Sequence, residues 1–93
     1  MSIHTIEVLV ENEPGVLARV AGLFSRRAFN IETLTVGPTE DSSISKMIIG
    51  VAVEGHSLEQ VIAQLDKLVS VISIKDVTAK AKEVHDTQPD YQN

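Results

Sequence analysis

The segment ENEPGVL, residues 11–17, decides the fold because it separates two different hydrophobic patterns. Before it, residues 3–11 carry apolar side chains at every second position, which predicts a β-strand. After it, apolar residues recur at spacings of three and four from Val16 to about Arg27, which predicts an amphipathic helix. Pro14 fits the first turn of that helix, where its missing N–H would have no helical partner. The segment therefore predicts a strand-turn-helix junction.

Two further strands are expected after this helix. Residues 31–36 are rich in β-branched side chains, and Gly37-Pro38 with the polar loop 39–43 ends the run. Residues 46–54 alternate again. The side of this third strand that is predicted to be buried carries Met47, Ile49, Val51 and Val53.

A second helix and a fourth strand complete the pattern. The turn Gly55-His56 precedes Ser57, which together with Gln60 predicts a capping box at the start of a helix ending near Lys67. Residues 69–77 predict a fourth strand. We expect Ile72 and Ile74 to share one side of this strand.

The order β-α-β-β-α-β predicts an α+β, ferredoxin-like fold, in which a four-stranded antiparallel sheet has two helices on one face. The folded domain is expected to span residues 1–79, followed by a polar, disordered tail at residues 80–93. The other sheet face is left uncovered. We expect apolar side chains there that favour self-association: Leu9, Leu34 or Val36, and Ile48.

Composition limits the possible functions. Ninety-three residues suit one domain, and with 3% aromatic residues the core has to be aliphatic. The absence of cysteine excludes disulfide and thiolate chemistry. A net charge of −5 disfavours a nucleic-acid partner. No leader pattern or long apolar run is present, so we expect a cytoplasmic protein without a membrane partner.

The turn at residues 12–15 is the best candidate ligand site. Gly15 allows a ligand to approach the backbone, and the N-terminus of the following helix favours an anion such as a carboxylate. Asn30 offers an amide donor and a carbonyl acceptor, which suits a zwitterion. The alternative is that Pro14-Gly15 only makes a tight turn and that Asn30 is only a turn residue.

Enzyme classes fit less well, and we predict no catalytic residue and no metal site. Ser25 and Ser43 lack the neighbours of a nucleophile. A ferredoxin-like hydrolase of the acylphosphatase type would need an arginine and an asparagine around a phosphate, and Arg19 and Arg26 lack such a loop. Metal-ligand or triad spacing is not found among the histidines His4, His56 and His85.

Three segments carry a resemblance to a known family. They are ENEPGVL at 11–17, GLFSRRAFNIE at 22–32 and LTVGPT at 34–39. Together they closely resemble the small subunit of acetolactate synthase (acetohydroxyacid synthase), whose first domain is an ACT domain. The resemblance covers about the first 78 residues.

The resemblance implies a non-catalytic regulatory subunit in valine, leucine and isoleucine biosynthesis. Such a subunit activates a catalytic large subunit and confers feedback inhibition by a branched-chain amino acid, usually valine. Thiamine diphosphate, Mg and FAD would then belong to the catalytic partner, and no cofactor to this chain. A stand-alone ACT-domain amino-acid sensor that controls another protein is the alternative.

The resemblance also implies an effector site between two ACT domains of a homodimer or higher oligomer. The residues that it assigns to effector binding are Asn12, Gly15 and Asn30, with Glu13, Pro14, Val16 and Leu17 lining the same loop. Many family members continue into a second domain after the ACT domain. We therefore expect effector binding, which needs only the ACT dimer, to depend less on that second domain than full activation of the catalytic subunit does.

Overall fold

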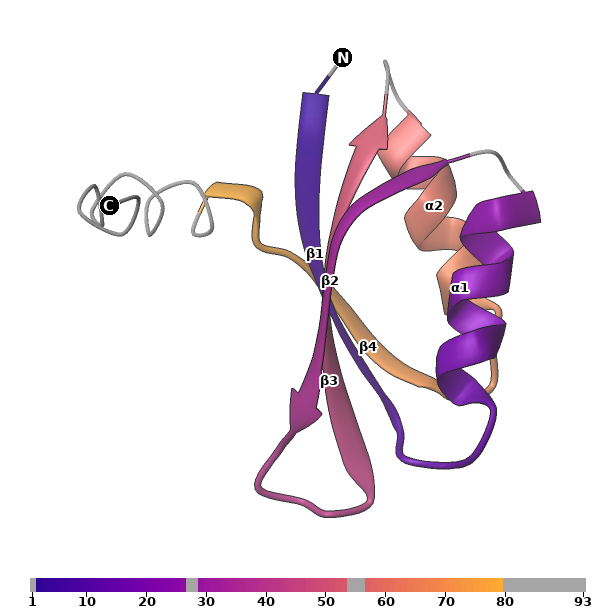
Figure 1. Cartoon of the computed structure of the whole chain (residues 1–93), viewed down its shortest axis with the longest axis vertical. Helices are drawn as coiled ribbons and strands as arrows, with labels where there is room; N and C mark the ends of the chain where they lie inside the picture. Colours follow the sequence, from indigo (N-terminus) through magenta and orange to yellow (C-terminus); the bar gives the residue numbers. More distant parts are fainter. Residues whose placement is uncertain (1, 27–28, 54–56, 80–93) are drawn as a thin grey trace.

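The computed structural model describes residues 2–26, 29–53 and 57–79. Its elements follow the predicted order, and both helices lie on the same side of the sheet (Figure 1). The ferredoxin-like α+β fold is thus confirmed. The elements are β1 (Ser2–Glu11), α1 (Val16–Arg26), β2 (Asn30–Pro38), β3 (Ile44–Val53), α2 (Ser57–Asp66) and β4 (Val71–Asp76).

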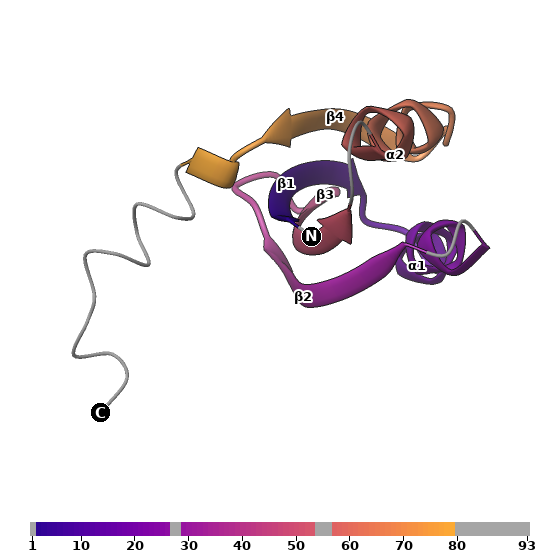
Figure 2. The same ribbon diagram turned by 90° about the horizontal axis from the view of Figure 1, so that it is seen from above.

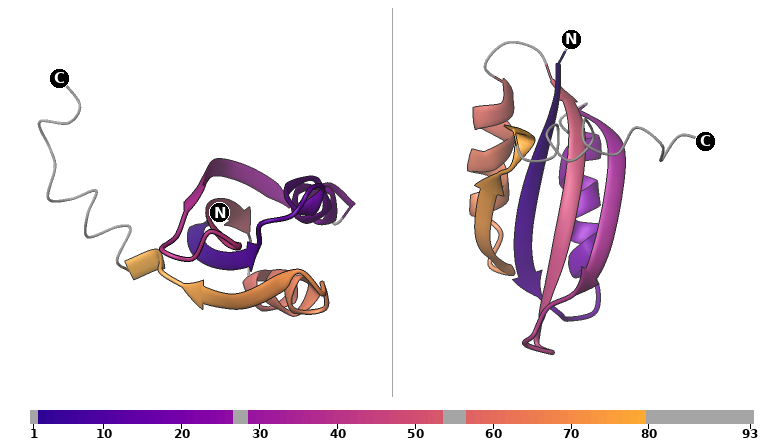
Figure 3. Two further views of the ribbon diagram at one scale, coloured as in Figure 1. Left: turned by 90° about the horizontal axis from the view of Figure 1, so that it is seen from below. Right: turned by 90° about the vertical axis from the view of Figure 1, so that its left-hand side faces the viewer.

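The four strands form one antiparallel sheet in the order β2-β3-β1-β4. The long central strands β1 and β3 pair along their whole length, from Ser2 opposite Val53 to Glu11 opposite Ile44. β2 and β4 are the edge strands, and the sheet twists strongly between them (Figures 2 and 3). Both α1 and α2 lie on one sheet face, and neither of them covers the other face.

The core lies between the sheet and the helices. Its sheet side is built from the apolar residues that alternate along the strands in the sequence. The inward side of β3 is buried as predicted, together with the alternate residues of β1. Phe24 on α1 is the largest fully buried side chain, and every other one is aliphatic or Met47. The fully buried residues are Phe24, Ile6, Met47, Ile49, Leu65, Val8, Val20, Val51 and Val61.

The start of α1 differs from the prediction. Gly15 has a φ of +86°, which a right-handed helix does not accommodate, so the helix begins at Val16. Pro14 therefore lies in the turn before the helix and not in its first turn. The Gly15 carbonyl accepts the first helical hydrogen bond, from the Arg19 amide at 3.0 Å, so Gly15 is the N-cap.

The fourth strand, β4, is shorter than predicted, and the residues on its two sides are not the predicted ones. The pairing of β1 with β4 shifts register between Leu9 and Val10, so that Val10 lies opposite Val71. Because of this irregularity, Val71 and Ile74 pack against the core, whereas Ile72 is 49% exposed. The expectation that Ile72 and Ile74 share a side is wrong.

The uncovered sheet face carries only some of the apolar side chains predicted for it. Leu9 and Ile48 lie on it, as predicted, because their register partners are Lys46 and Glu7. Leu34 and Val36 instead lie opposite Ile49 and Met47, which places them on the helix side. They remain 41% and 46% exposed because β2 is an edge strand.

Some predictions concern residues outside the described ranges. They are the Gly55-His56 turn, the capping-box side chain of Ser57, and the tail 80–93. Within the described part of the chain, neither helix has the length and apolar character needed to span a membrane.

Candidate functional site

The turn between β1 and α1 is built from short backbone hydrogen bonds. The Glu13 amide donates to the Glu11 carbonyl at 3.0 Å, and the Val16 amide donates to the Glu13 carbonyl at 3.3 Å. The amides of Leu17 and Ala18 lie in the first helical turn, where no intrahelical acceptor exists. They are therefore available to an anionic group at the positive end of the helix dipole.

Asn12 is held by a loop thirty residues away in the sequence. Its backbone amide donates to the Ser43 carbonyl at 2.8 Å, and its side-chain Nδ2 donates to the Ser42 carbonyl at 3.1 Å. Both acceptors lie in the hairpin loop between β2 and β3. With Nδ2 engaged, the Oδ1 of Asn12 is the side-chain atom left to accept a hydrogen bond from a ligand.

A hollow of about 190 Å³ lies beside this turn. Its size is below the roughly 300–1,000 Å³ of pockets for drug-sized ligands, so it suits a small molecule on the scale of an amino acid. Four of the predicted site residues line it: Asn12, Glu13, Val16 and Leu17. The other lining residues are Val10, Glu11, Val36, Ser45 and Met47.

The hollow combines apolar and charged groups. Val10, Val16 and Met47 are buried, whereas Leu17 and Val36 are each 46% exposed and form the outer, apolar part of the wall. Sequence reasoning missed Val36, Ser45 and Met47, since only the pairing of β2 with β3 and of β3 with β1 brings them next to the turn.

Arg19 is a further residue that sequence reasoning did not place at the turn. Its Nη1 donates to the Oγ of Ser70 at 3.0 Å, and its Nη2 lies 3.7 Å from the position that a Cβ on Gly15 would occupy. Ser70 is buried, and its carbonyl also accepts the Glu11 amide at 2.9 Å. The Arg19–Ser70 contact thus joins α1 to the segment before β4 and places a positive charge beside the turn.

Asn30 lies at the other end of the sheet. It opens β2 opposite Ala52, whereas Asn12 follows Glu11, which lies opposite Ile44. Eight residues of β3 separate Ile44 from Ala52, which corresponds to about 26 Å at a rise of about 3.3 Å per residue. The side-chain Nδ2 of Asn30 donates to the carboxylate of Glu32. One chain therefore brings Asn12 and the loop residues together but not Asn30.

Two carboxylates have shifted pKa values, and both shifts have a local cause. The hydroxyl of Ser43 and, to a smaller extent, its backbone amide donate to Asp41 and hold the pKa of that carboxyl below its usual range. The hydroxyl and amide of Thr78 do the same for the pKa of Asp76. Among the residues that the structure describes, no group of three or more His, Asp or Glu side chains could hold a metal ion.

Sequence comparisons relate the chain to a known family. Residues 6–73 match the model of the AHAS small subunit-like ACT domain. A probable acetolactate synthase small subunit of Archaeoglobus fulgidus is 58% identical over 80 residues, which are 86% of this chain and 50% of the relative. The acetolactate synthase small subunit of Mycolicibacterium smegmatis is 59% identical over 71 residues, 76% of this chain and 42% of the relative. The chain thus spans about half the length of these relatives.

Solved structures agree with this relationship. The acetolactate synthase small subunit from Thermotoga maritima superposes with a TM-score of 0.77 at 39% identity, covering 82% of this chain and 47% of that one. The ACT domain from GTP pyrophosphokinase of Chlorobium tepidum gives a TM-score of 0.68 at 19% identity, covering 80% of this chain and 95% of that domain. The second likeness concerns the fold alone.

Proposed function

The chain belongs to the family of AHAS small subunit-like ACT domains, and from this we propose that it serves as a regulatory subunit of acetolactate synthase. In this role it binds a branched-chain amino acid, valine in the first instance, and thereby confers feedback inhibition on a catalytic large subunit that it also activates. It contributes no catalytic group. Thiamine diphosphate, Mg and FAD belong to the catalytic partner.

The observation that carries this proposal is the hollow beside the N-terminus of α1, where groups suited to each part of an amino acid meet. The carboxylate of valine fits the amides of Leu17 and Ala18 at the helix N-terminus. Its ammonium fits the Oδ1 of Asn12 and the neighbouring carboxylate of Glu13. Its isopropyl group fits the apolar wall that Leu17 and Val36 form.

Two copies of the chain complete the site. Asn12 and Asn30 lie at opposite ends of the sheet, so an antiparallel arrangement of two copies brings the turn of one next to Asn30 of the other. The edge strand β2 supports such an arrangement, because it has unpaired backbone groups on its outer side. Exposed apolar side chains lie along the same edge: Leu17, Leu34 and Val36.

Regulation requires that valine bind one arrangement of the subunits more tightly than another, because equal affinities shift no equilibrium. A ligand held between two copies meets this requirement, since its affinity depends on how the copies are packed. Bound valine then favours the packing that the inhibited complex uses. The catalytic subunit favours the other packing.

Calorimetric titration of the chain with valine tests the site. We expect Asn12→Ala and Asn30→Ala each to weaken valine binding by roughly 1.5–3 kcal/mol, the usual contribution of a hydrogen bond to a charged group, with the fold retained in circular dichroism. Thr35→Ala, an exposed position on the uncovered face, is the matched control. Wild-type valine affinity in both asparagine variants would contradict the site. Co-purification with a thiamine-diphosphate enzyme separates this role from that of a stand-alone sensor.

A further inference from the structure

The hairpin loop between β2 and β3 is held together by its own hydrogen bonds. The Thr39 hydroxyl lies 2.8 Å from the Asp41 carbonyl and 3.0 Å from the Ile44 carbonyl, shares its single proton between these two acceptors, and accepts the Asp41 amide at 3.1 Å. The amide and hydroxyl of Ser43 both donate to Asp41 Oδ1, at 2.9 and 2.6 Å. These bonds connect residues 39–43 into one cross-linked tip.

This tip has two different neighbours. On one side, the carbonyls of Ser42 and Ser43 accept the side-chain and backbone N–H groups of Asn12. On the other side, Thr39, Glu40 and Asp41 form a wall of a second, larger hollow on the uncovered sheet face. The hairpin tip thus links the proposed effector turn to a surface that α1 and α2 do not cover.

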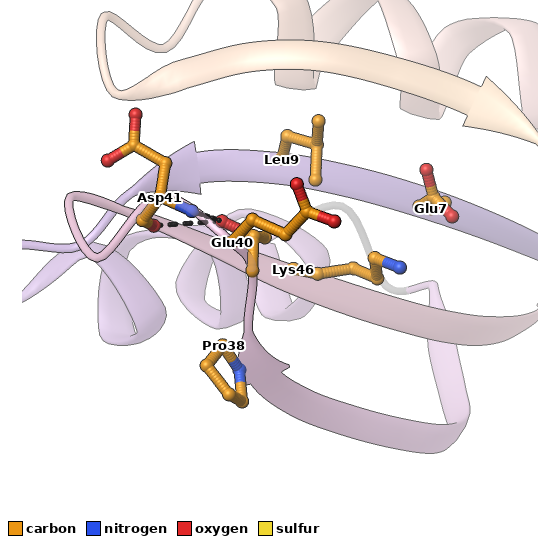
Figure 4. A pocket seen from close by; sticks show the side chains of 7 residues that line it. Glu7, Leu9, Pro38, Glu40, Asp41 and Lys46 are labelled. Atoms are coloured by element: carbon orange, nitrogen blue, oxygen red, sulfur yellow. Dashed lines mark hydrogen bonds between the residues drawn. The ribbon is translucent and has the colours of Figure 1, made fainter.

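The larger hollow has a volume of about 690 Å³ and is predominantly acidic (Figure 4). Leu9 supplies apolar surface in it, and Glu7, Glu40 and Asp41 outnumber the single cation Lys46. Figure 4 shows the Glu40 carboxylate in the part of the hollow between Leu9 and Lys46. A second copy of this chain, whose net charge is −5, would bring acid against acid, whereas a basic segment is complementary to it.

We propose that this hollow is the docking surface for a basic segment of the catalytic subunit, and that the hairpin tip transmits effector binding at Asn12 to it. The inference rests on the proposed function, from which it takes the partner and the effector. When the Asn12 amide turns to contact the effector, its Nδ2 moves relative to the Ser42 carbonyl. The tip follows, and the wall of the hollow moves with it.

Binding of the full chain to the purified catalytic subunit of the same organism tests the surface. Glu40→Lys reverses a charge on the exposed tip, and Glu59→Lys makes the same change on α2, in the layer away from the hollow. We expect Glu40→Lys to weaken binding about tenfold or more and to reduce its salt dependence, with unchanged valine affinity. Glu59→Lys should bind as the wild type does. Wild-type affinity in Glu40→Lys, or a change in self-association only, would overturn the docking surface.

Hydrogen exchange with and without valine tests the transmission. We expect valine to change exchange at the amides of residues 41, 43 and 44 as well as at the Asn12 turn, and to leave the amides of α2 unchanged. Valine binding that alters the turn but leaves the tip unchanged would overturn the transmission. If the wild-type chain shows no valine binding in calorimetry, the proposed function fails instead, and the salt-dependent binding to the catalytic subunit still reports on the hollow.

Discussion

At the scale of single residues, Gly15 links the backbone to the proposed chemistry. Its φ of +86° ends the turn, and its carbonyl starts the hydrogen-bond ladder of α1. Both features fix the start of α1, where Val16 and Leu17 line the small hollow. The glycine is needed for its dihedral angle, since an added Cβ would lie 3.7 Å from its nearest neighbour, an ordinary contact distance.

Gly15→Ala should therefore destabilise the chain by about 1–2 kcal/mol, the cost of a left-handed conformation for an L-residue, and should weaken valine binding. Gly37→Ala is the matched control, because its Cβ would meet open space and its φ is not positive. Urea unfolding of both variants measures the difference. Equal stability of the two would show that the turn tolerates a side chain at Gly15.

At the scale of elements, the chain after β4 is attached to β1 by a small hydrogen-bond group. The Val77 amide donates to the Thr5 carbonyl at 2.9 Å, and the Thr5 amide donates to the Thr78 hydroxyl at 3.0 Å. The Asp76 carboxylate accepts the hydroxyl and amide of Thr78, at 2.6 and 3.0 Å. Asp76 thereby orients the side chain that contacts β1.

This group predicts a pH dependence of folding. Since the pKa of Asp76 is lowered by folding from an ordinary value of about 3.8, its contribution is present above pH 3.8 and is lost as the pH falls through the folded value. Asp76→Asn should therefore lose less stability than the wild type between pH 5 and about pH 2. Asp41 has a lowered pKa as well, so the loss is reduced and not abolished. Parallel acid-unfolding curves for wild type and variant would contradict this.

At the scale of the whole molecule, the two edges of the sheet are unequal. The β2 edge adjoins the small hollow and carries Leu34 and Val36, which are half exposed. The β4 edge carries the exposed Ile72 at the register shift. The pairing of β2 with β3 also shifts register, between Ile31 and Thr33, so the two edges differ in their apolar side chains and not in regularity. Because Leu34 and Val36 extend along the β2 edge beside the small hollow, we expect this edge to be the better one for self-association.

Leu34→Glu should accordingly convert the proposed dimer into a monomer in sedimentation velocity, because it places a charge on the β2 edge, where the two copies are proposed to meet. Ile72→Glu makes the same change on the β4 edge and should leave the dimer intact. Valine affinity should fall with the loss of the dimer, since Asn30 of the second copy is then missing. Dissociation by Ile72→Glu alone would assign the interface to β4.

The local patterns of the sequence determined the order of the elements, the buried sides of β1 and β3, and the turn at Asn12 to Gly15. These follow from hydrophobic periodicity and from the conformational preferences of proline and glycine, which act over a few residues. The turn that carries most of the proposed effector residues was therefore predictable as a turn, as were the sheet and its two helices. The resemblance supplied the family, which the comparisons confirm.

Only the tertiary structure decided which side chains of the edge strands are exposed and which site residues lie close together. Both depend on which strands pair and in what register. The register shift between Leu9 and Val10 exposes Ile72, and the pairing of β2 with β3 places Leu34 and Val36 on the helix side. A strand pattern of period two does not reveal a one-residue shift in a partner strand. The bonds from Asn12 to the hairpin and the distance to Asn30 likewise arise from contacts between segments far apart in the chain.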